Sequence, residues 1–458
     1  MGLKVIVIGA GAAGLQAGRR LSSAGAGVTI LEAGARPGGR IVTIPSGGSI
    51  AAAGSGPFGA EWTGYEWIDS ELPGKGFSET VEGGAEFIHG NLPLSLQLAK
   101  EAGAALVPTG GQMIRLRRGE SLTQQDKDRE VLPSQDWHRL LAEMRALTTD
   151  MPMAEFLSEK FPGPRYEALR DSARGFAQGY DLADLDKVST TSLYREWSAE
   201  DEEEEGYRAQ GGYGRLIDYL TGLCLDQGCH IHFSTPVTGV RWQRGRVEVH
   251  MAGGEVFTAD RLVVTVSLGV LKAGLIRFDP ALPVQVQAID RLGYGQIVKA
   301  LLEWKEPFWR TRKHPDQTLF IISEEPVPTW WTQSADDCGL ITGWITGEPM
   351  WAFRRLEGAA RIDSCVASLA AIFGMEPRRL RESLKAATVF DWVAAPYVLG
   401  GYSFETVGSA EARSILSRPV EDTIYFSGEA LYEGKVPGTV EAAFSSGLAT
   451  AESMISGL

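Results

Sequence analysis

The chain has 458 residues, of which 44% are hydrophobic and 22% charged. This balance is typical of a soluble globular protein, and the length exceeds what one hydrophobic core usually serves, so we expect at least two domains. Lys and Arg number 44 against 58 Asp and Glu, which gives a formal net charge of −14. That charge disfavours nucleic acid and anionic membranes as partners and favours cationic ligands.

Cysteine and histidine patterns exclude further classes of protein. The four cysteines have neither CxxC nor metal-ligand spacing, so we expect reduced thiols in a cytoplasmic protein. The histidines form no ligand pattern, and no metal site is predicted. The apolar N-terminus lacks the charged leader and cleavage site of a signal peptide, and no segment has about eighteen uninterrupted apolar residues. No membrane anchor is therefore expected.

The N-terminal segment KVIVIGAGAAGL places an apolar strand before a glycine-rich turn and the start of a helix. Its glycines have GxGxxG spacing, which allows a tight turn, close approach of a pyrophosphate and close packing of the helix. An acidic residue ends the next strand, where a carboxylate accepts hydrogen bonds from ribose hydroxyls and disfavours the 2'-phosphate of NADP. The pattern predicts a dinucleotide site at the helix N-terminus. Its residues are Gly9, Gly11, Ala13, Gly14, Glu32 and Ala33.

The next segment, ARPGGRI, favours FAD. Two guanidinium groups and two glycines follow the ribose-binding acid and suit a second pyrophosphate contact. This arrangement resembles the RxGGR element of the flavoprotein family that contains monoamine, polyamine and L-amino-acid oxidases. The resemblance assigns Arg36, Gly39 and Arg40 to the cofactor, which we expect to be FAD.

The following segments alternate between loop and helix. Residues 46–80 show no sustained period and predict a long loop with an aromatic cluster at Trp62, Tyr65 and Trp67. From 93 to about 209 the pattern is helical with few strand signals. The acidic run 200–205 near its end is typical of a solvated loop, and a role in steering cationic substrate is the alternative.

Strand patterns return in the second half. The segment 230–266 predicts several strands and a hairpin, and new strands after 293 precede a helix that ends at Gly374. The last segment predicts a strand, a loop and a helix. We therefore expect an α/β fold, a Rossmann-like FAD-binding domain of the glutathione-reductase/amine-oxidase type interleaved with an α+β substrate-binding domain. The predicted FAD-binding segments are 1–92, 207–292 and 391–458, and the substrate-binding segments are 93–206 and 293–390.

Two further stretches resemble cofactor elements of the family. GGAEFIHG (83–90) is similar to the segment that runs along the flavin ring and, in polyamine oxidases, presents a histidine to the substrate, here His89. A histidine that bridges backbone groups near the cofactor is the alternative. In STPVTGV, the backbone of Val237 matches the strand that meets the adenine. The first stretch assigns Gly84, Ala85, Glu86 and Phe87 to the cofactor.

A lysine in LGYGQIVKALLEWKEPFW matches the family lysine that holds a water against flavin N5. This residue is Lys299, within a run of mostly apolar residues. Burying a lysine is costly unless its ammonium finds partners, which a flavin and a water would supply. An exposed lysine on an edge strand is the alternative. In the functional role, its positive charge would assist the reduction of oxygen.

The C-terminal region resembles the family's substrate cage. Trp392 is expected beside the flavin, and Tyr402 forms one wall, where aromatic faces suit an amine. Gly401 stands where monoamine oxidases carry the cysteine that joins FAD, so we expect noncovalent FAD. Thr439 matches the facing wall, which leaves the cage half open and favours a bulkier or extended amine. Gly428, Glu429, Thr439 and Val440 are further assigned to the cofactor, with the N–H of Val440 directed at the pyrimidine edge of the flavin.

The resemblance implies an FAD-dependent oxidase of a primary or secondary amine. Hydride would pass to flavin N5, the imine would hydrolyse to an aldehyde or ketone, and oxygen would become hydrogen peroxide. The enzyme would be a monomer or homodimer. An L-amino-acid oxidase would need an arginine for the substrate carboxylate, for which Arg195 and Arg354 are candidates. A desaturase is disfavoured by the Lys299 and Tyr402 motifs, and a catalytically silent flavoprotein that serves as a binding module is a further alternative.

Overall fold

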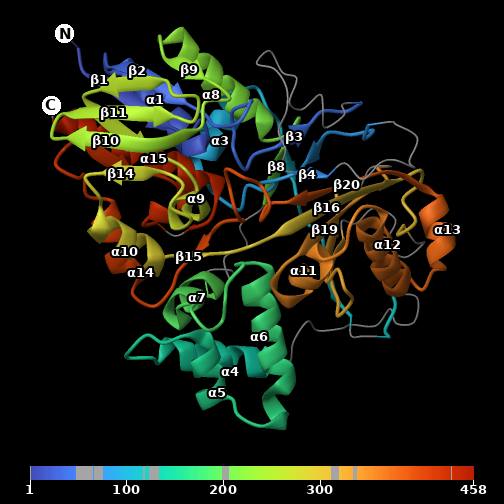
Figure 1. The fold of residues 1–458 in the computed structure, drawn as a ribbon. Coiled ribbons are helices and arrows are strands. Elements are labelled where there is room, and N and C mark those ends of the chain that lie inside the picture. Colours follow the sequence, from blue (N-terminus) through green and yellow to red (C-terminus); the bar gives the residue numbers. More distant parts are fainter. Residues whose placement is uncertain are drawn as a thin grey trace.

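Two sheets organise the computed structural model (Figure 1). It describes residues 2–47, 65–66, 76–116, 119–122, 134–198, 206–310, 319–333, 338–434 and 436–457. Most of the predicted loop 46–80, with Trp62 and Trp67 of its aromatic cluster, lies outside these ranges, as does the acidic run 200–205. The two expectations about those segments stay predictions.

The first sheet is parallel and has the strand order β22-β13-β1-β2-β9. Its central strands are short apolar runs, as is usual where both faces of a parallel sheet are covered. Alternate residues of β1 serve different cores: Val5 and Val7 pack with helices, and Ile6 and Ile8 pack with a second, four-stranded sheet. The parallel strands are β1 (Lys4–Ile8), β2 (Gly27–Leu31), β9 (His230–His232), β13 (Arg261–Val264) and β22 (Ile424–Phe426).

Helices and a β-layer enclose this sheet. Helix α1 packs against α15 and α8, so the first and last helices of the chain share one core. The helices are α1 (Ala12–Ser23), α8 (Gly214–Asp226) and α15 (Val440–Ser456). The β-layer contains β10 (Val237–Gln243), β11 (Arg246–Met251), β12 (Val256–Ala259) and β14 (Arg277–Asp279), with α9 (Leu268–Lys272), α10 (Pro283–Arg291) and α14 (Ser409–Leu416) beside it.

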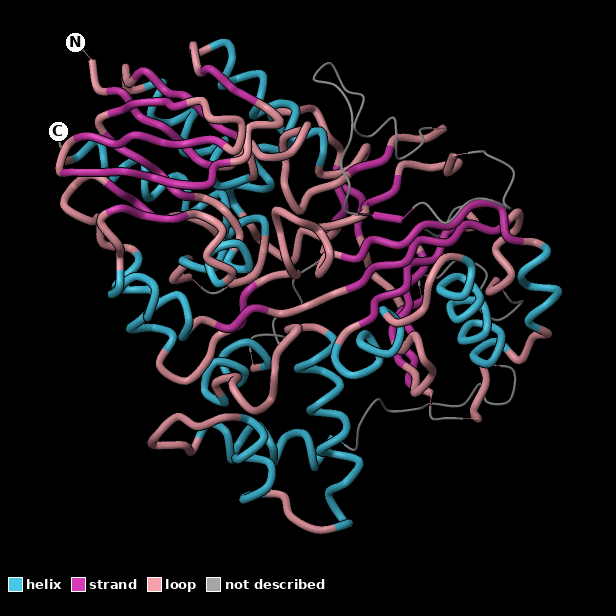
Figure 2. Tube along the Cα trace, viewed as in Figure 1, coloured by secondary structure: helices cyan, strands magenta, loops and turns pink. Residues whose placement is uncertain are grey.

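The second large sheet has seven strands in the order β4-β20-β16-β19-β18-β17-β7, and Figure 2 shows its long central strands beside a group of helices. Alternation along β16 divides its side chains: Val298, Ala300 and Leu302 pack in one core with helix α12, whereas Leu301 packs in a separate core with Phe390. Lys299 shares the face of Leu301. The strands are β4 (Tyr65–Glu66), β7 (Gln112–Arg115), β16 (Val298–Trp304), β17 (Leu319–Ile322), β18 (Thr329–Thr332), β19 (Leu340–Ile345) and β20 (Leu384–Asp391), and the helices are α11 (Gly347–Arg354), α12 (Ala359–Phe373) and α13 (Pro377–Glu382).

A helical group lies below this sheet in Figure 1 and has its own core. It contains α4 (Ser134–Arg145), α5 (Met153–Lys160), η1 (Pro164–Tyr166), α6 (Glu167–Gly179) and α7 (Thr190–Trp197). Short strand pairs connect the parts: β3 (Thr43–Ile44) with β5 (Val81–Glu82), β6 (Leu106–Pro108) with β8 (Tyr207–Ala209), and β15 (Gly293–Tyr294) with β21 (Ser403–Phe404). Helix α3 (Pro93–Glu101) and η3 (Glu429–Leu431) complete the described elements.

Several predicted elements are confirmed. The N-terminal strand, turn and helix, the strands of 230–266, and the helix that ends at Gly374 in the left-handed conformation are all present. The helical prediction for 93–209 misses β6, β7 and β8, and no strand was expected at β18. These strands have three or four residues, too few to show a period of two. The division into two discontinuous domains stays a prediction, and β4 of the first segment pairs with β20.

All four cysteines are free. Within the part of the chain that the structure describes, no helix is both long enough and apolar enough to cross a bilayer.

Glu441 has a role that its sequence position did not reveal. It lies in the first turn of α15, and its buried carboxylate accepts hydrogen bonds from the backbone N–H groups of Leu94 and Ser95 at 3.0 and 2.7 Å and from the Ser95 hydroxyl at 2.8 Å. These groups begin helix α3, where a carboxylate is favoured. Glu441 therefore caps one helix from another.

Glu441→Ala is expected to lower the free energy of unfolding by about 2–4 kcal/mol, because it leaves buried donors without acceptors. Glu452→Ala on the same helix removes only the exposed ion pair with Arg20 and should cost about 1 kcal/mol or less. Denaturant midpoints of the two variants measure the difference. Equal midpoints would contradict the capping role.

Candidate active site

The start of α1 has the features of an anion site. The helix follows Gly11, has no side-chain cap and has no acidic residue in its first turn. A Cβ on Gly11 would meet nothing within 4 Å, whereas a Cβ on Gly14 would lie 1.9 Å from the carbonyl oxygen of Gly9. Gly9 itself has φ of +106°. Gly11 thus leaves open space, Gly14 allows close packing and Gly9 allows a tight turn, at a helix end whose first N–H groups have no partner within the helix.

Glu32 is held beside this turn. Its carboxylate accepts hydrogen bonds from the N–H groups of Ala10 and Gly34, both at 2.7 Å. Burial raises the pKa of Glu32 against the opposing effect of these hydrogen bonds. The backbone therefore sets the orientation of the side chain, with Ala33 next to it in the chain. A contact with ribose stays a prediction.

Arg36 and Arg40, which the sequence assigned to the same cofactor contact, have different hydrogen-bond partners. Arg36 donates to the carbonyls of Pro37, Gly39 and Ile41 at 2.7–2.8 Å, and so it fixes its own loop. These bonds engage both terminal nitrogens of the guanidinium group, and the predicted contact of Arg36 with a pyrophosphate stays a prediction.

Arg40 instead lines a pocket, together with Gly428 and Glu429. It donates to the Gly401 carbonyl at 2.7 Å and pairs with Glu429 at 2.9 Å. A Cβ on Gly428 would meet nothing within 4 Å. Open space at Gly11 and Gly428, a helix N-terminus and one arginine suit a dinucleotide with a pyrophosphate. The residues present therefore fit the implied FAD.

The backbone of the GGAEFIHG segment is tightly enclosed. Trp392 donates from its indole N–H to the Gly83 carbonyl at 2.9 Å. A Cβ on Gly84 would lie 1.8 Å from the Arg40 carbonyl oxygen, and Ala85 donates to that same oxygen at 3.3 Å. The two glycines are therefore required for packing, and Trp392 is fixed against the segment.

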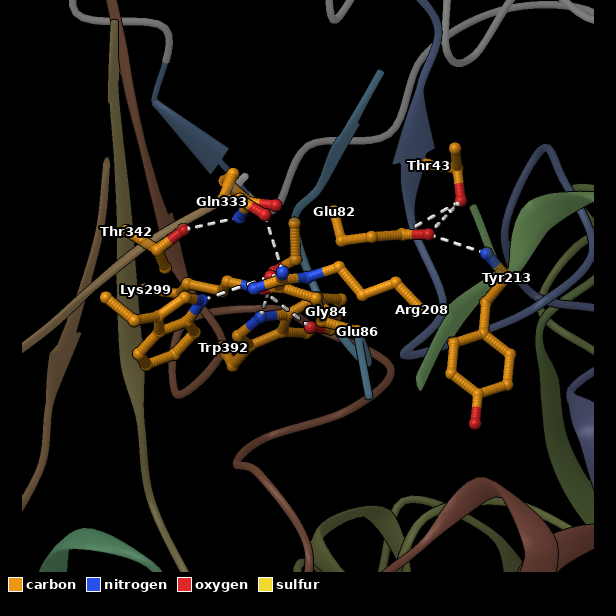
Figure 3. A network of polar contacts seen from close by, with 12 residues as sticks. Thr43, Glu82, Gly84, Glu86, Arg208, Tyr213, Lys299, Gln333, Thr342 and Trp392 are labelled. Atoms are coloured by element: carbon orange, nitrogen blue, oxygen red, sulfur yellow. Dashed lines mark hydrogen bonds and ion pairs between the residues drawn. The ribbon is translucent and has the colours of Figure 1, made fainter. Parts of the chain in front are cut away.

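Lys299 points into this region and has no exposed surface. All seven residues of β16 are buried. Its ammonium donates to Glu86 at 2.8 Å and to the Gly84 carbonyl at 3.1 Å, as Figure 3 shows. It also lies 5.5 Å from the centre of the Trp331 ring. The alternative of an exposed edge-strand lysine is wrong, because β16 lies between β20 and β19.

Glu86 joins Lys299 to two residues that the sequence did not indicate. Its carboxylate accepts from Arg208 at 2.8 Å and from the indole N–H of Trp331 at 3.0 Å. Burial alone would raise the pKa of Glu86, but the charges of Lys299 and Arg208 lower it below its ordinary value. Arg208 also lies over the ring of Phe87, with 4.6 Å to its centre. Arg208 and Trp331 come from short strands without a motif.

Aromatic side chains surround His89. The side chain of His89 has an exposed surface, but protein atoms also lie close around it. Their desolvating effect lowers the pKa of His89. Its ring lies 5.9 Å from that of Tyr180, which is 43% exposed, and Tyr402 donates its hydroxyl to the Tyr180 carbonyl. The structure thus brings His89 and Tyr402 together through Tyr180, which sequence reasoning missed.

Thr439 is the N-cap of α15. Its hydroxyl accepts from the Ala442 N–H at 3.1 Å and donates to the Val436 carbonyl at 2.8 Å. The preceding residue, Gly438, approaches the Tyr402 ring so closely that a Cβ would lie 2.9 Å from it. Thr439 therefore lies near Tyr402, and its hydroxyl is already used in capping. Val440 begins the helix, where unpaired N–H groups are found.

The remaining predicted residues are placed as follows. Val237 begins β10, pairs with Met251 and is followed by a bulge, and its contact with adenine stays a prediction. Arg195 pairs with Glu405 on the surface at 2.7 Å, and Arg354 donates to both oxygens of Asp391. Both arginines are engaged in ion pairs.

A profile of the flavin-containing amine oxidoreductase family matches residues 12–455, and the chain belongs to this family. It is 26% identical to lysine-specific histone demethylase 1B of Mus musculus over 97% of this chain and 52% of that protein, and 27% identical to polyamine oxidase 4 of Oryza sativa subsp. japonica over 98% of this chain and 88% of that protein. The chain thus spans about half the length of the demethylase relatives it matches.

Solved structures share the fold. A putrescine oxidase bound to putrescine has a TM-score of 0.76 at 20% identity, with 100% of this chain and 99% of that chain covered. Cyclohexylamine oxidase from Brevibacterium oxydans has a TM-score of 0.76 at 19% identity, with the same coverage. The expected α/β class, with an FAD-binding unit and a substrate-binding unit, is confirmed.

Glu82 is a second buried carboxyl group near Lys299. Figure 3 shows that it turns toward Thr43 and Tyr213. The Thr43 hydroxyl lies 2.8 and 2.9 Å from its two oxygens, and the Tyr213 N–H donates to it at 2.6 Å. Burial raises the pKa of Glu82 from its ordinary value of 4.5 to about 8, despite these hydrogen bonds and the charge of Lys299. Glu82 is therefore a neutral acid at neutral pH.

The raised pKa of Glu82 predicts a stability that falls as pH rises. The folded protein holds a proton on Glu82 between pH 4.5 and about 8, whereas the unfolded chain does not. This contribution is complete below pH 4.5 and is lost as pH passes 8. Glu82→Gln mimics the neutral acid, so the variant and the wild type should have similar melting temperatures at pH 6. At pH 9 the variant should melt at a higher temperature than the wild type, by an amount that corresponds to on the order of 1–3 kcal/mol in the free energy of unfolding. An equal difference at both pH values would contradict this.

The glycines of the first turn predict two different losses. Gly14→Ala places its Cβ against the Gly9 carbonyl and should destabilise the apoprotein by about 3 kcal/mol or more. Gly11→Ala meets open space at φ −76°, which alanine tolerates, so the apoprotein should melt as the wild type does. Its FAD affinity should nevertheless fall about tenfold or more, because the added methyl occupies the approach of the pyrophosphate. Flavin fluorescence titration and apoprotein melting separate the two effects.

Proposed function

We propose that the chain is an FAD-dependent oxidase of a primary or secondary amine. The observation that carries the proposal is Lys299, a buried ammonium on an otherwise apolar strand, held against Gly84 of the GGAEFIHG segment. When bound, FAD would supply the acceptor chemistry, for a hydride from the carbon that bears the amine and for passing its electrons to oxygen, which would become hydrogen peroxide. The imine product then hydrolyses in water to an aldehyde or ketone.

The chain's own residues would bind the cofactor and orient the substrate. Gly11 and the N–H groups of α1 would hold the pyrophosphate, with Arg40 on its other side. Trp392 and Lys299 would flank the flavin, and Lys299 would place a positive charge where negative charge develops.

Noncovalent binding follows from Gly401, which has no side chain to form a bond. Precipitation with acid should therefore release all of the flavin into the supernatant.

The aromatic side chains around His89 support an amine as substrate. His89 has a lowered pKa and is neutral at neutral pH, so it does not repel an incoming cation. The rings of Tyr180 and Tyr402 offer faces that attract one. The amine would have to lose its proton before its carbon gives up hydride. With Thr439 used as a cap, no aromatic ring stands at that position, which favours an extended amine.

The relatives narrow the substrate class to be tested. Polyamine oxidase 4 and the putrescine oxidase are named for amines with several amino groups or an extended chain. The demethylase relatives act, by their name, on lysine, whose side chain is also an extended amine. An L-amino-acid oxidase is less well supported, because Arg195 and Arg354 are bound to carboxylates. The four free cysteines agree with a reducing compartment such as the cytoplasm.

The proposal is tested by anaerobic mixing of the yellow holoprotein with polyamines, arylalkylamines, N-methyl-lysine peptides and L-amino acids. We expect an extended amine to bleach the flavin absorbance and, in air, to release hydrogen peroxide. Bleaching by amino acids alone would instead indicate an amino-acid oxidase. Flavin that no compound bleaches would indicate the catalytically silent module.

Lys299→Met should slow reoxidation of the reduced flavin by oxygen about tenfold or more, since it removes the positive charge. Lys385→Met removes another lysine of the same sheet, paired with Glu303 at 2.9 Å, and serves as the matched control. Stopped-flow absorbance follows both half-reactions. Unchanged rates in Lys299→Met would remove this residue from the mechanism.

A further inference from the structure

The carboxylate of Glu86 is held by donors from three different strands. Lys299 of β16 donates to one oxygen at 2.8 Å. Arg208 of β8 and the indole of Trp331 of β18 donate to the other oxygen at 2.8 and 3.0 Å. Both oxygens are engaged from fixed directions, so the carboxylate cannot rotate. The position of the Lys299 ammonium is thereby tied to two elements far from it in sequence.

Arg208 is itself fixed. It donates to the Gln333 carbonyl at 2.6 Å, as well as to Glu86, and it stacks on the Phe87 ring. The Lys299, Glu86 and Arg208 side chains are at most 15% exposed. Few water molecules therefore screen their charges. Burying such a group is favourable only when each charge has a good partner.

The charges of this triad, defined as Lys299, Glu86 and Arg208, sum to +1. Without Arg208, Glu86 would cancel the charge of Lys299, and the site would offer no net positive charge. Glu82 is a second buried carboxyl group near Lys299, although it turns toward Thr43 and Tyr213, and as a neutral acid up to about pH 8 it leaves this sum unchanged. Arg208 is therefore the residue that keeps the net charge positive.

We propose that Glu86 and Arg208 are positioning residues for Lys299: Glu86 fixes the ammonium beside the Gly84 carbonyl, and Arg208 orients Glu86 and keeps the triad at a net charge of +1. This inference rests on the role proposed for Lys299 in the oxidase. It assigns to Arg208 an effect on the flavin that passes through the other two side chains. A merely structural ion pair would affect stability and leave the flavin chemistry unchanged.

The test compares the holoprotein with Arg208→Met, Arg208→Lys and Glu86→Gln. Glu303→Gln is the matched control, because Glu303 lies on the same strand and face as Lys299, about 13 Å along it, and is also a buried carboxylate paired with a lysine. Two quantities are measured on dithionite-reduced protein: the rate of reoxidation by oxygen, and the flavin midpoint potential by dye equilibration. Neither measurement requires an amine.

Arg208→Met should lower the midpoint potential and slow reoxidation about tenfold, because the triad becomes neutral. Arg208→Lys should recover the potential, since it restores the charge, and only part of the rate, since it lacks the planar guanidinium. As the pH is raised, the reoxidation rate of Glu86→Gln should begin to fall at a lower pH than that of the wild type. The reason is that a buried ammonium group without its carboxylate partner loses its proton more easily. Glu303→Gln should match the wild type in both quantities.

The inference is overturned if Arg208→Met and Glu86→Gln keep the wild-type potential and pH profile while Lys299→Met alters them. It is overturned as well if Glu303→Gln gives the same changes as Glu86→Gln. The changes would then follow from the loss of any buried carboxylate of this sheet and would not depend on the contact with Lys299. If Arg208→Met does not retain FAD, Arg208→Lys and Glu86→Gln decide by the same measurements. Failure of every amine to bleach the flavin rejects the proposed oxidase, whereas a shifted potential in Arg208→Met still supports the positioning role.

Discussion

The arrangement of the site depends on the burial of one ammonium group. Lys299 lies in a strand whose seven residues are all buried, and an unpaired charge there would be strongly destabilising. Its partners, Gly84 and Glu86, belong to a different part of the chain from β16. The hydrogen bond to Gly84 and the ion pair with Glu86 therefore stabilise the packing of the GGAEFIHG segment against the seven-stranded sheet. Glu86 also forms an ion pair with Arg208, so three segments that are distant in the sequence contact one another here.

Features whose physical cause is local could be predicted from the sequence. The turn between β1 and α1 is specified by Gly9 and Gly14, which contact each other across five residues. Glu32 accepts hydrogen bonds from Ala10 and Gly34 within the same β-α-β unit. The strand that carries Lys299 was predicted from its apolar run. In each case the pattern and the contact lie in one short stretch of chain.

Features that depend on distant partners could not be predicted in this way. Arg208 reaches a carboxylate 122 residues away, and Trp331 reaches the same carboxylate across 245 residues. Glu441 looked like an ordinary first-turn acid, since its partners on α3 are 346 or 347 residues away. Arg36 donates to the carbonyls of its own loop, and its contact with a pyrophosphate stays a prediction. A charge pattern identifies a donor but does not identify its acceptor.

The two sides of the site differ in electrostatic character, and the difference bears on the proposed reaction. On one side, Lys299, Glu86 and Arg208 keep a fixed net positive charge in a region with little water. On the other side, burial lowers the pKa of His89 and raises that of Tyr402, and the charges of Asp181 and Glu196 add to the second shift, so both rings are uncharged at neutral pH. In the proposed reaction, a cationic amine would not be repelled on that side. Negative charge that develops during the proposed oxidation would meet the charged side, and the proposed reaction would need no side chain to exchange a proton between them.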